Sequence, residues 1–171
     1  MLRVKVPNFY AHCLFWGLSL IGFVADIWSK EAVFKWLIDK PYQRVSIVGD
    51  FISFRLAENA GAAFSMAHGQ RFFLVATSFT AFVAIIFAFE IGVFKTLFSR
   101  MIASLFFAGV SGNLYDRLFN DGRVRDFIDV NLYINNYHWP TFNIADSLLC
   151  VAVGFCLWDA FKNKENKKCV D

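Results

Sequence analysis

The sequence predicts a mainly α-helical membrane protein with four transmembrane helices, a small extracytoplasmic β-hairpin and a polar extracytoplasmic loop. Hydrophobic residues make up 57% of the 171 residues and the mean hydropathy is +0.47. A soluble domain of this length does not bury that much apolar surface. Four apolar stretches each approach the length that crosses a bilayer, and polar residues gather at one end of the later stretches. We therefore interpret residues 1–171 as a single integral-membrane domain.

Each of the four apolar stretches predicts one membrane-spanning helix. An α-helix rises about 1.5 Å per residue, so these stretches approach the ~30 Å of a bilayer's hydrocarbon core. The first follows Arg3 and Lys5 and lacks a small-residue cleavage site, so we expect a retained helix instead of a removable leader. The four predicted helices cover residues 10–28, 72–89, 101–115 and 141–161.

Basic residues near the helix ends predict the orientation in the membrane. They concentrate before the first helix, between the second and third, and after the fourth, and a four-helix topology places these regions on one side. The positive-inside rule makes that side cytoplasmic, together with both termini. Residues 31–70 and 116–140 then lie on the extracytoplasmic side, where basic residues are spread more thinly. The residues that define the cytoplasmic side are Arg3, Lys5, Lys95, Arg100, Lys162, Lys164, Lys167 and Lys168.

Residues 42–57 have the pattern of a β-hairpin. The runs 44–47 and 52–56 each alternate between apolar and polar side chains, which is the period of a half-buried strand. Gly49-Asp50 lies between the runs and supplies turn residues. We expect a small sheet that lies on the membrane surface.

Two acids lie on either side of a short polar stretch that precedes the fourth helix. Asp126 belongs to an apparently extended segment, and Asp146 lies a turn inside the fourth apolar run. A carboxylate in or beside hydrocarbon is costly unless it has a partner or a function. We interpret the two as a pair that converges at one membrane face, shares a proton and activates water. Taken alone, Asp126 also fits an ordinary surface-loop acid.

Other polar residues share helix faces with these acids. Asn113, Asp116 and Arg117 are spaced i, i+3 and i+4, and Asn143 precedes Asp146 by three residues. A solvated helix end would explain the first group, and a pure N-cap role would explain Asn143.

Two earlier motifs have simple structural interpretations. Asp26 and Lys30 are four residues apart on the first helix with the acid first, which predicts a structural ion pair. In residues 58–64, small side chains around Gly61 allow close approach of backbone or ligand. A tight loop packed on a neighbour explains that stretch equally well.

The sequence argues against several other chemistries. Residues 109–112 have the G-x-S-G form of rhomboid serine proteases, but Ser111 lacks a suitably placed helical histidine. No zinc-ligand spacing occurs, and the four cysteines form no CxxC pair. The net charge of +3 is too small and dispersed to predict nucleic-acid binding. The histidines are His12, His68 and His138.

Taken together and in order, these motifs resemble the lipoprotein signal peptidases, also called signal peptidase II. The resemblance extends from the first helix to the fourth, and although each motif alone is weak, five in this order on four membrane helices are specific. The motifs are Asp26-x-x-x-Lys30, Glu58-Asn59-Ala60-Gly61-Ala62-Ala63-Phe64, Gly112-Asn113-x-x-Asp116-Arg117, Asp126-Phe127 and Phe142-Asn143-x-Ala145-Asp146.

The resemblance implies roles for individual residues. It makes Asp126 and Asp146 the catalytic aspartates. Asp121 and Asp129 are alternative loop acids, because the stretch that follows Arg117 is a residue longer than the family pattern; the Asp126-Phe127 context favours Asp126. The implied site-lining residues are Asn59, Gly61, Asn113, Asp116, Arg117 and Asn143.

The resemblance also implies an activity: a membrane aspartic endopeptidase that removes the signal peptide from diacylglyceryl-modified prolipoproteins, cleaving before the lipidated Cys. Such an enzyme would be a monomer in the bacterial inner membrane, in contact with membrane lipids. Its active site would lie at the extracytoplasmic face and would need no metal or organic cofactor. Two other classes remain. A small transporter or proton channel should place its charges near the bilayer midplane, and a structural assembly subunit would have no hydrolysis to lose.

Overall fold

The computed structural model describes residues 6–61, 70–133 and 138–168, with side chains described up to residue 164. The described residues form four long helices and four short strands. In chain order the elements are α1 (Phe9–Leu37), the short 3-10 helix η1 (Pro41–Gln43), β1 (Arg44–Val48), β2 (Ile52–Asn59), α2 (Arg71–Glu90), α3 (Leu97–Phe119), β3 (Val124–Asn131), β4 (His138–Phe142) and α4 (Ile144–Lys168).

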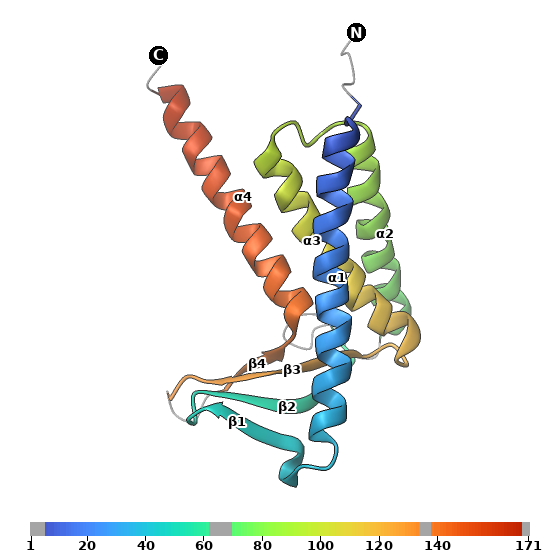
Figure 1. The fold of residues 1–171 in the computed structure, drawn as a ribbon, viewed down its shortest axis with the longest axis vertical. Coiled ribbons are helices and arrows are strands. Elements are labelled where there is room, and N and C mark those ends of the chain that lie inside the picture. The colour runs from blue at the N-terminus through green and yellow to red at the C-terminus, as the bar shows by residue number, and fades with distance from the viewer. Residues whose placement is uncertain (1–5, 62–69, 134–137, 169–171) are drawn as a thin grey trace.

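The four helices run along the long axis, and the sheet lies across one end of them (Figure 1). α1 begins and α4 ends at the opposite end. All four helices are long and apolar enough to cross a membrane, and α3 packs against each of the other three. The protein is therefore a multi-pass membrane protein whose central helix is α3.

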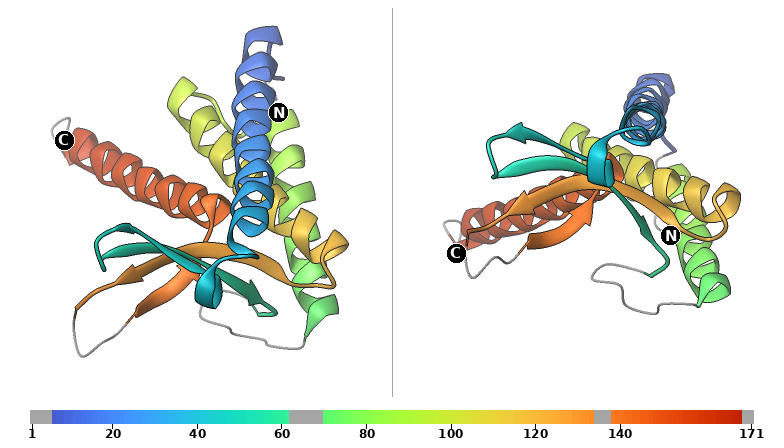
Figure 2. Two further views of the ribbon diagram at one scale, coloured as in Figure 1. Left: turned by 60° about the horizontal axis from the view of Figure 1, so that its bottom comes forward. Right: turned by 90° about the horizontal axis from the view of Figure 1, so that it is seen from below.

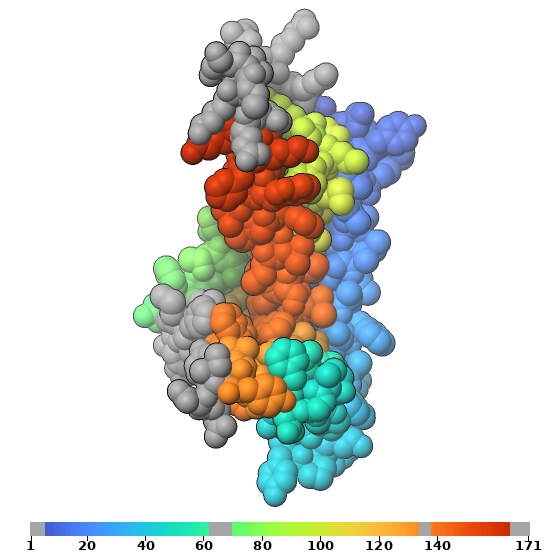
Figure 3. All heavy atoms as spheres, turned by 90° about the vertical axis from the view of Figure 1, so that its left-hand side faces the viewer, coloured from blue at the N-terminus to red at the C-terminus, as the bar shows by residue number. Residues whose placement is uncertain are grey.

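Apolar side chains cover the outer faces of the helices. Phe79 and Phe87 on α2 and Leu157 and Trp158 on α4 are each more than half exposed. Water would disfavour these surfaces and lipid suits them. Viewed from the side of α4, that helix rises from the sheet with α1 and α2 on opposite flanks (Figure 3).

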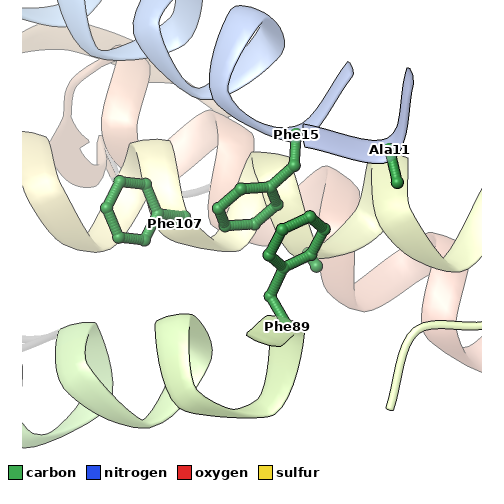
Figure 4. Packing of buried hydrophobic residues seen from close by; sticks show 5 residues of the cluster. Ala11, Phe15, Phe89 and Phe107 are labelled. Atoms are coloured by element: carbon green, nitrogen blue, oxygen red, sulfur yellow. The ribbon is translucent and has the colours of Figure 1, made fainter. Parts of the chain in front are cut away.

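Aromatic side chains hold α1, α2 and α3 together far from the sheet. Phe15 stacks on Phe89 with ring centroids 4.1 Å apart, and Phe107 packs against Phe15 from α3 at 5.5 Å (Figure 4). Ala11 lies beside them and leaves room for the rings. This cluster joins the ends of the helices where no acid of the predicted site lies.

The sheet is antiparallel with the strand order β1-β2-β3-β4. β1 and β2 form the hairpin that the sequence predicts within residues 42–57. The polar segment 116–140, which we expected as a loop, contains β3 and the start of β4. β4 continues through Thr141 and Phe142, which we predicted as the start of the fourth helix, and α4 begins at Ile144. β3 is buried on both faces, because Val124, Asp126, Phe127 and Asp129 are all nearly inaccessible. It therefore lacks the simple alternation that makes a strand recognisable in sequence.

The first helix is longer than its apolar core. The predicted span 10–28 lies inside α1, which continues to Leu37. Lys30, Glu31 and Lys35 belong to this extension, and it brings α1 up to the sheet (Figure 2). Asp26 and Lys30 thereby lie level with the polar ends of α3 and α4.

Candidate active site

Asp126 lies on β3, one of the two central strands, with only 1% of its surface exposed. It pairs with Ala57 of β2, and two residues further along the same register Val124 pairs with Asn59. Asn59 is therefore a diagonal neighbour on the same face of the sheet, and its side chain hydrogen-bonds to the Asp126 carboxylate. The β2–β3 pairing thus brings together two residues that the sequence places in separate motifs.

Asp146 lies in the first turn of α4 and is partly exposed. Asn113 Nδ2 of α3 donates to Asp146 Oδ1 at 2.7 Å. The backbone N–H of Asn143 donates to Asp146 Oδ2 at 3.3 Å, and Asn143 Oδ1 accepts from the N–H of Asp146 at 3.0 Å. This reciprocal arrangement is that of a capping box, so Asn143 caps α4 as one interpretation of the sequence suggested.

Asn143 also connects the two carboxylates. Its Nδ2 donates to Asp126 Oδ1 at 2.7 Å while its Oδ1 accepts from the backbone of Asp146. The same Nδ2 lies 3.2 Å from Asn113 Oδ1. One fully buried amide therefore holds β3, α3 and the start of α4 together at the site.

The environment of Asp126 favours its neutral form. Burial, with a smaller contribution from the nearby charge of Asp146, raises the pKa of Asp126 from 3.8 to about 7. Hydrogen bonds from Asn143 and Asn59 and the charge of Lys30 act in the opposite direction. A buried carboxyl beside a second carboxylate holds its proton to higher pH, so the pair is suited to carry a single proton near neutrality.

Arg117 anchors the chain beside Asn59. Its Nη2 donates to the carbonyl of Gly61 at 3.3 Å, and its Nη1 donates to the carbonyl of Asn113 at 3.4 Å. Gly61 in turn donates its N–H to Asn59 Oδ1 at 2.9 Å. These contacts join α3 to the end of β2. Residues 62–64 of the predicted motif lie outside the described part of the chain.

Asp116 lies behind the carboxylate pair. It accepts from the backbone N–H of Arg125 at 2.9 Å and from the Arg125 guanidinium at 2.7 Å. It also lies 3.2 Å from Lys30 Nζ. We predicted Asp116 as a site-lining residue; the structure shows it holding the start of β3. Arg125 was not among the predicted site residues, although its guanidinium binds Asp116. The one feature of the sequence that could have indicated it is its position next to Asp126.

The two alternative acids lie elsewhere. Asp121 is exposed in the tight turn between α3 and β3, where it and Gly122 both have positive φ, as Asp-Gly turns allow. Asp129 is fully buried and accepts from Ser53 Oγ at 3.0 Å, with Arg44 and His138 as ionic partners at 3.3 and 3.0 Å. These partners come from the other three strands, so Asp129 fastens the sheet.

The G-x-S-G segment serves helix packing. Ser111 Oγ donates to the carbonyl of Phe107 in its own helix at 2.6 Å. His12 lies beside Phe89 and Glu90, and His138 is engaged by Asp129; His68 lies outside the described residues. Among the described side chains, no three His, Cys, Asp or Glu residues gather as a metal site would require.

Known proteins resemble this chain over nearly its whole length. A family profile described as signal peptidase (SPase) II matches residues 18–162. A lipoprotein signal peptidase of Alteromonas mediterranea is 34% identical over 157 residues, covering 90% of this chain and 83% of that protein. One of Yersinia pestis is 32% identical over 158 residues and covers 90% of each.

Solved structures agree with these sequence matches. One bacterial membrane enzyme, solved at 2.3 Å, superposes with a TM-score of 0.80 at 27% identity, over 96% of both chains. Another, solved at 1.9 Å, gives 0.75 at 27% identity, over 94% of this chain and 98% of the other. With the family profile and the curated relatives, these likenesses show that the chain belongs to the signal peptidase II family.

Proposed function

We propose that this chain removes the signal peptide from diacylglyceryl-modified prolipoproteins, cleaving before the lipidated Cys, with Asp126 and Asp146 as its catalytic aspartates. The observation that carries the proposal is the bridge formed by the Asn143 side chain. Its amide N–H donates to the Asp126 carboxylate, and its amide oxygen accepts from the backbone N–H of Asp146. One of these acids is buried and the other partly exposed. That asymmetry is what an acid and a base need in order to act together.

The two carboxyl groups divide the chemistry between them. Both Asp146 oxygens accept N–H donors, which suits an ionised carboxylate. Asp146 takes a proton from water while the water oxygen attacks the carbonyl carbon of the scissile peptide. Asp126, which holds the shared proton, donates a hydrogen bond to the developing oxyanion. When the carbon–nitrogen bond breaks, the proton held by Asp146 passes to the leaving amine.

The same arrangement supports a site at the membrane surface. A diacylglyceryl chain would keep the substrate's Cys at the bilayer surface. Asp126 is on β3 and Asp146 is in the first turn of α4, and α4 begins at the end of the helices where the sheet lies (Figure 1). With the basic helix ends cytoplasmic, the pair faces the extracytoplasmic side of the inner membrane. Asp126, Asp146 and Asn143 all come from one chain, so a monomer suffices, and residues 1–171 act as one peptidase unit.

The test is cleavage in vitro. The full chain is purified in detergent and given a diacylglyceryl-modified prolipoprotein in the presence of EDTA. Wild type should cut, whereas Asp126→Asn and Asp146→Asn should each lose at least ~100-fold in rate, because each removes one partner of an acid–base pair. Asp121→Asn is the matched control, since that exposed acid of the neighbouring turn should be dispensable.

Two results would overturn the proposal. One is an intact substrate after incubation with wild type under conditions where a known signal peptidase II cuts it. The other is wild-type turnover by either aspartate variant.

A further inference from the structure

Lys30 is a buried ammonium with three acceptors around it. Its Nζ lies 2.7 Å from Asp26 Oδ2, 3.2 Å from Asp116 Oδ2 and 3.2 Å from Asn113 Oδ1. Lys30, Asp26 and Asp116 are all fully inaccessible. This one side chain of α1 therefore ion-pairs with two carboxylates and donates a hydrogen bond to the Asn113 amide oxygen. A local ion pair within α1 would need only Asp26.

The two carboxylates bound to Lys30 each hold a backbone N–H at the site. Asp26 Oδ1 accepts from the N–H of Ala145 at 2.8 Å. Asp116 Oδ2 accepts from the N–H of Arg125 at 2.9 Å. Ala145 immediately precedes Asp146, and Arg125 immediately precedes Asp126. The Lys30 ammonium is therefore linked to the main chain beside both aspartates. Through Asp26 it is linked to the residue before Asp146, and through Asp116 to the residue before Asp126.

The third acceptor of Lys30 sets the orientation of an amide. Asn113 Oδ1 faces Lys30 Nζ and Asn143 Nδ2, both of which are donors. Its Nδ2 must therefore point the other way, where it donates to Asp146 Oδ1 at 2.7 Å. A flipped amide would present an oxygen to the Asp146 carboxylate and would lose this hydrogen bond.

We propose that Lys30 is the positioning residue of the carboxyl pair: through Asp26, Asp116 and Asn113 it sets the separation and orientation of Asp126 and Asp146. This inference rests on the proposed function, and it assigns Lys30 more than the structural ion pair that the sequence predicts. Positioning has a large effect on rate, because a misplacement of about 1 Å in a reacting group can cost about 100-fold.

The charge of Lys30 supplies a readout that a purely structural role would not move. Lys30 lowers the pKa of Asp126, whereas burial and Asp146 raise it. Removing the ammonium therefore raises that pKa, and the alkaline limb of activity, where Asp126 loses its proton, moves to higher pH. The charged groups that face this network are Asp26, Asp116, Asp146, Arg117 and Arg125.

The decisive variant is the double substitution Lys30→Met with Asp26→Asn. Lys30→Met alone leaves two buried carboxylates around an absent cation, which disfavours folding. Asn at position 26 keeps an oxygen acceptor for the N–H of Ala145 and removes one of those charges, while Asp116 keeps Arg125 as its partner. Lys35→Met is the matched control, because Lys35 is an exposed lysine of the same helix that pairs with Glu31.

Each protein is assayed as the solubilised full chain with the diacylglyceryl prolipoprotein across a pH series, alongside its thermal unfolding. We expect the double variant to stay folded at the assay temperature, with kcat reduced about 100-fold, KM little changed and the alkaline limb moved to higher pH. Lys35→Met should behave as wild type. Wild-type kcat and an unmoved pH limb in a folded double variant would overturn the proposal.

A second variant keeps the proposal falsifiable if the double variant unfolds. Lys30→Gln retains a neutral N–H donor in the same place. Its kcat and the alkaline limb of its activity are measured in the same way, and wild-type values of both in the folded variant would overturn the proposal. Asp126→Asn and Asp146→Asn are measured in parallel. Turnover in those variants would overturn the proposed function, whereas inactive aspartate variants beside a wild-type-like Lys30 variant would overturn only the positioning role.

Discussion

At the scale of single residues, two aspartates of identical chemistry acquire different properties from their surroundings. Asp126 is enclosed by the sheet and the helix ends, with 1% of its surface exposed. Asp146 lies at the start of a helix, partly open and with N–H donors on both oxygens. Enclosure and the neighbouring charge favour the neutral form of Asp126. The division of roles between acid and base that we propose rests on this difference in position.

The raised pKa of Asp126 predicts a pH dependence of both activity and stability. Activity should fall as pH rises above about 7, because Asp126 then loses the proton that it donates. The pKa of Asp126 in the folded state, about 7, exceeds the ordinary value of 3.8. Between pH 3.8 and about 7 the folded protein therefore holds this proton more tightly than the unfolded chain does. The free energy of unfolding therefore decreases as pH rises through that window, by up to about 1.4 kcal/mol per pH unit.

Thermal unfolding in detergent between pH 4 and pH 8 checks the stability half of this prediction. Asp126→Asn mimics the neutral acid, so its advantage over wild type should grow with pH and be largest at pH 8. Asp121→Asn, in the exposed turn, should follow wild type throughout. Parallel curves for wild type and Asp126→Asn would contradict the assignment.

At the scale of elements, the site depends on how closely α3 approaches α1 and α4. A Cβ built at Gly112 would overlap the Asp26 carboxylate and lie 3.2 Å from Cβ of Ala145. A Cβ at Gly109 would meet the carbonyl of Ala145 at 2.7 Å. Side chains at these positions would push α4 away from α3, and Asp146 would move with α4. The small residues of α3 are thus packing surfaces that keep the carboxyl pair together.

Gly112→Ala should therefore lower both stability and activity. The Asp26 carboxylate cannot move aside without losing Lys30 and the N–H of Ala145, so we expect a loss of ~1–3 kcal/mol in the free energy of unfolding together with a lower kcat. Gly17→Ala is the control: nothing lies within 4 Å of its added methyl group, and alanine favours helix. Thermal unfolding and the cleavage rate measure both; equal behaviour of the two variants would contradict the packing argument.

At the scale of the whole molecule, the fold separates an apolar body from a polar cap. The helices present exposed apolar side chains along their length, and the sheet lies across one end only (Figure 2). The carboxyl pair lies between them, where a lipid-anchored peptide would arrive from the bilayer. The orientation of the chain therefore decides which compartment the site serves.

Cysteine labelling tests that orientation. In a variant in which Cys13, Cys150, Cys156 and Cys169 are replaced by Ala, a single reporter is introduced as Asp50→Cys in the hairpin turn or Lys164→Cys near the end of α4. In spheroplasts, a membrane-impermeant maleimide should label the hairpin reporter. It should label the α4 reporter only after permeabilisation. The opposite pattern would place the site on the cytoplasmic side.

Several features could be predicted along the chain because their physical cause is local. A bilayer imposes a length and an apolar composition on every span, so four helices were recognisable without any contact information. The hairpin was recognisable because apolar and polar residues alternate on either side of the Gly49-Asp50 turn, which is also local information. The order of short motifs sufficed to identify the family, and it is the basis on which we predict Asp126 and Asp146 as the catalytic acids.

Other features depend on contacts between distant parts of the chain. The pairing of β3 and β4 was not predicted: the segment was expected as a polar loop with an extended stretch at Asp126, because a strand buried on both faces and rich in Asp lacks a periodic signature. Asp116 stays a predicted site-lining residue, but its contact with the main chain of Arg125 has no signature in the sequence. The Asp26–Lys30 pair looked local, but Asp26 reaches an N–H 119 residues away. Nearly every residue has the same backbone N–H group, so the sequence does not show which of these groups a buried carboxylate will bind. That choice depends on the tertiary structure.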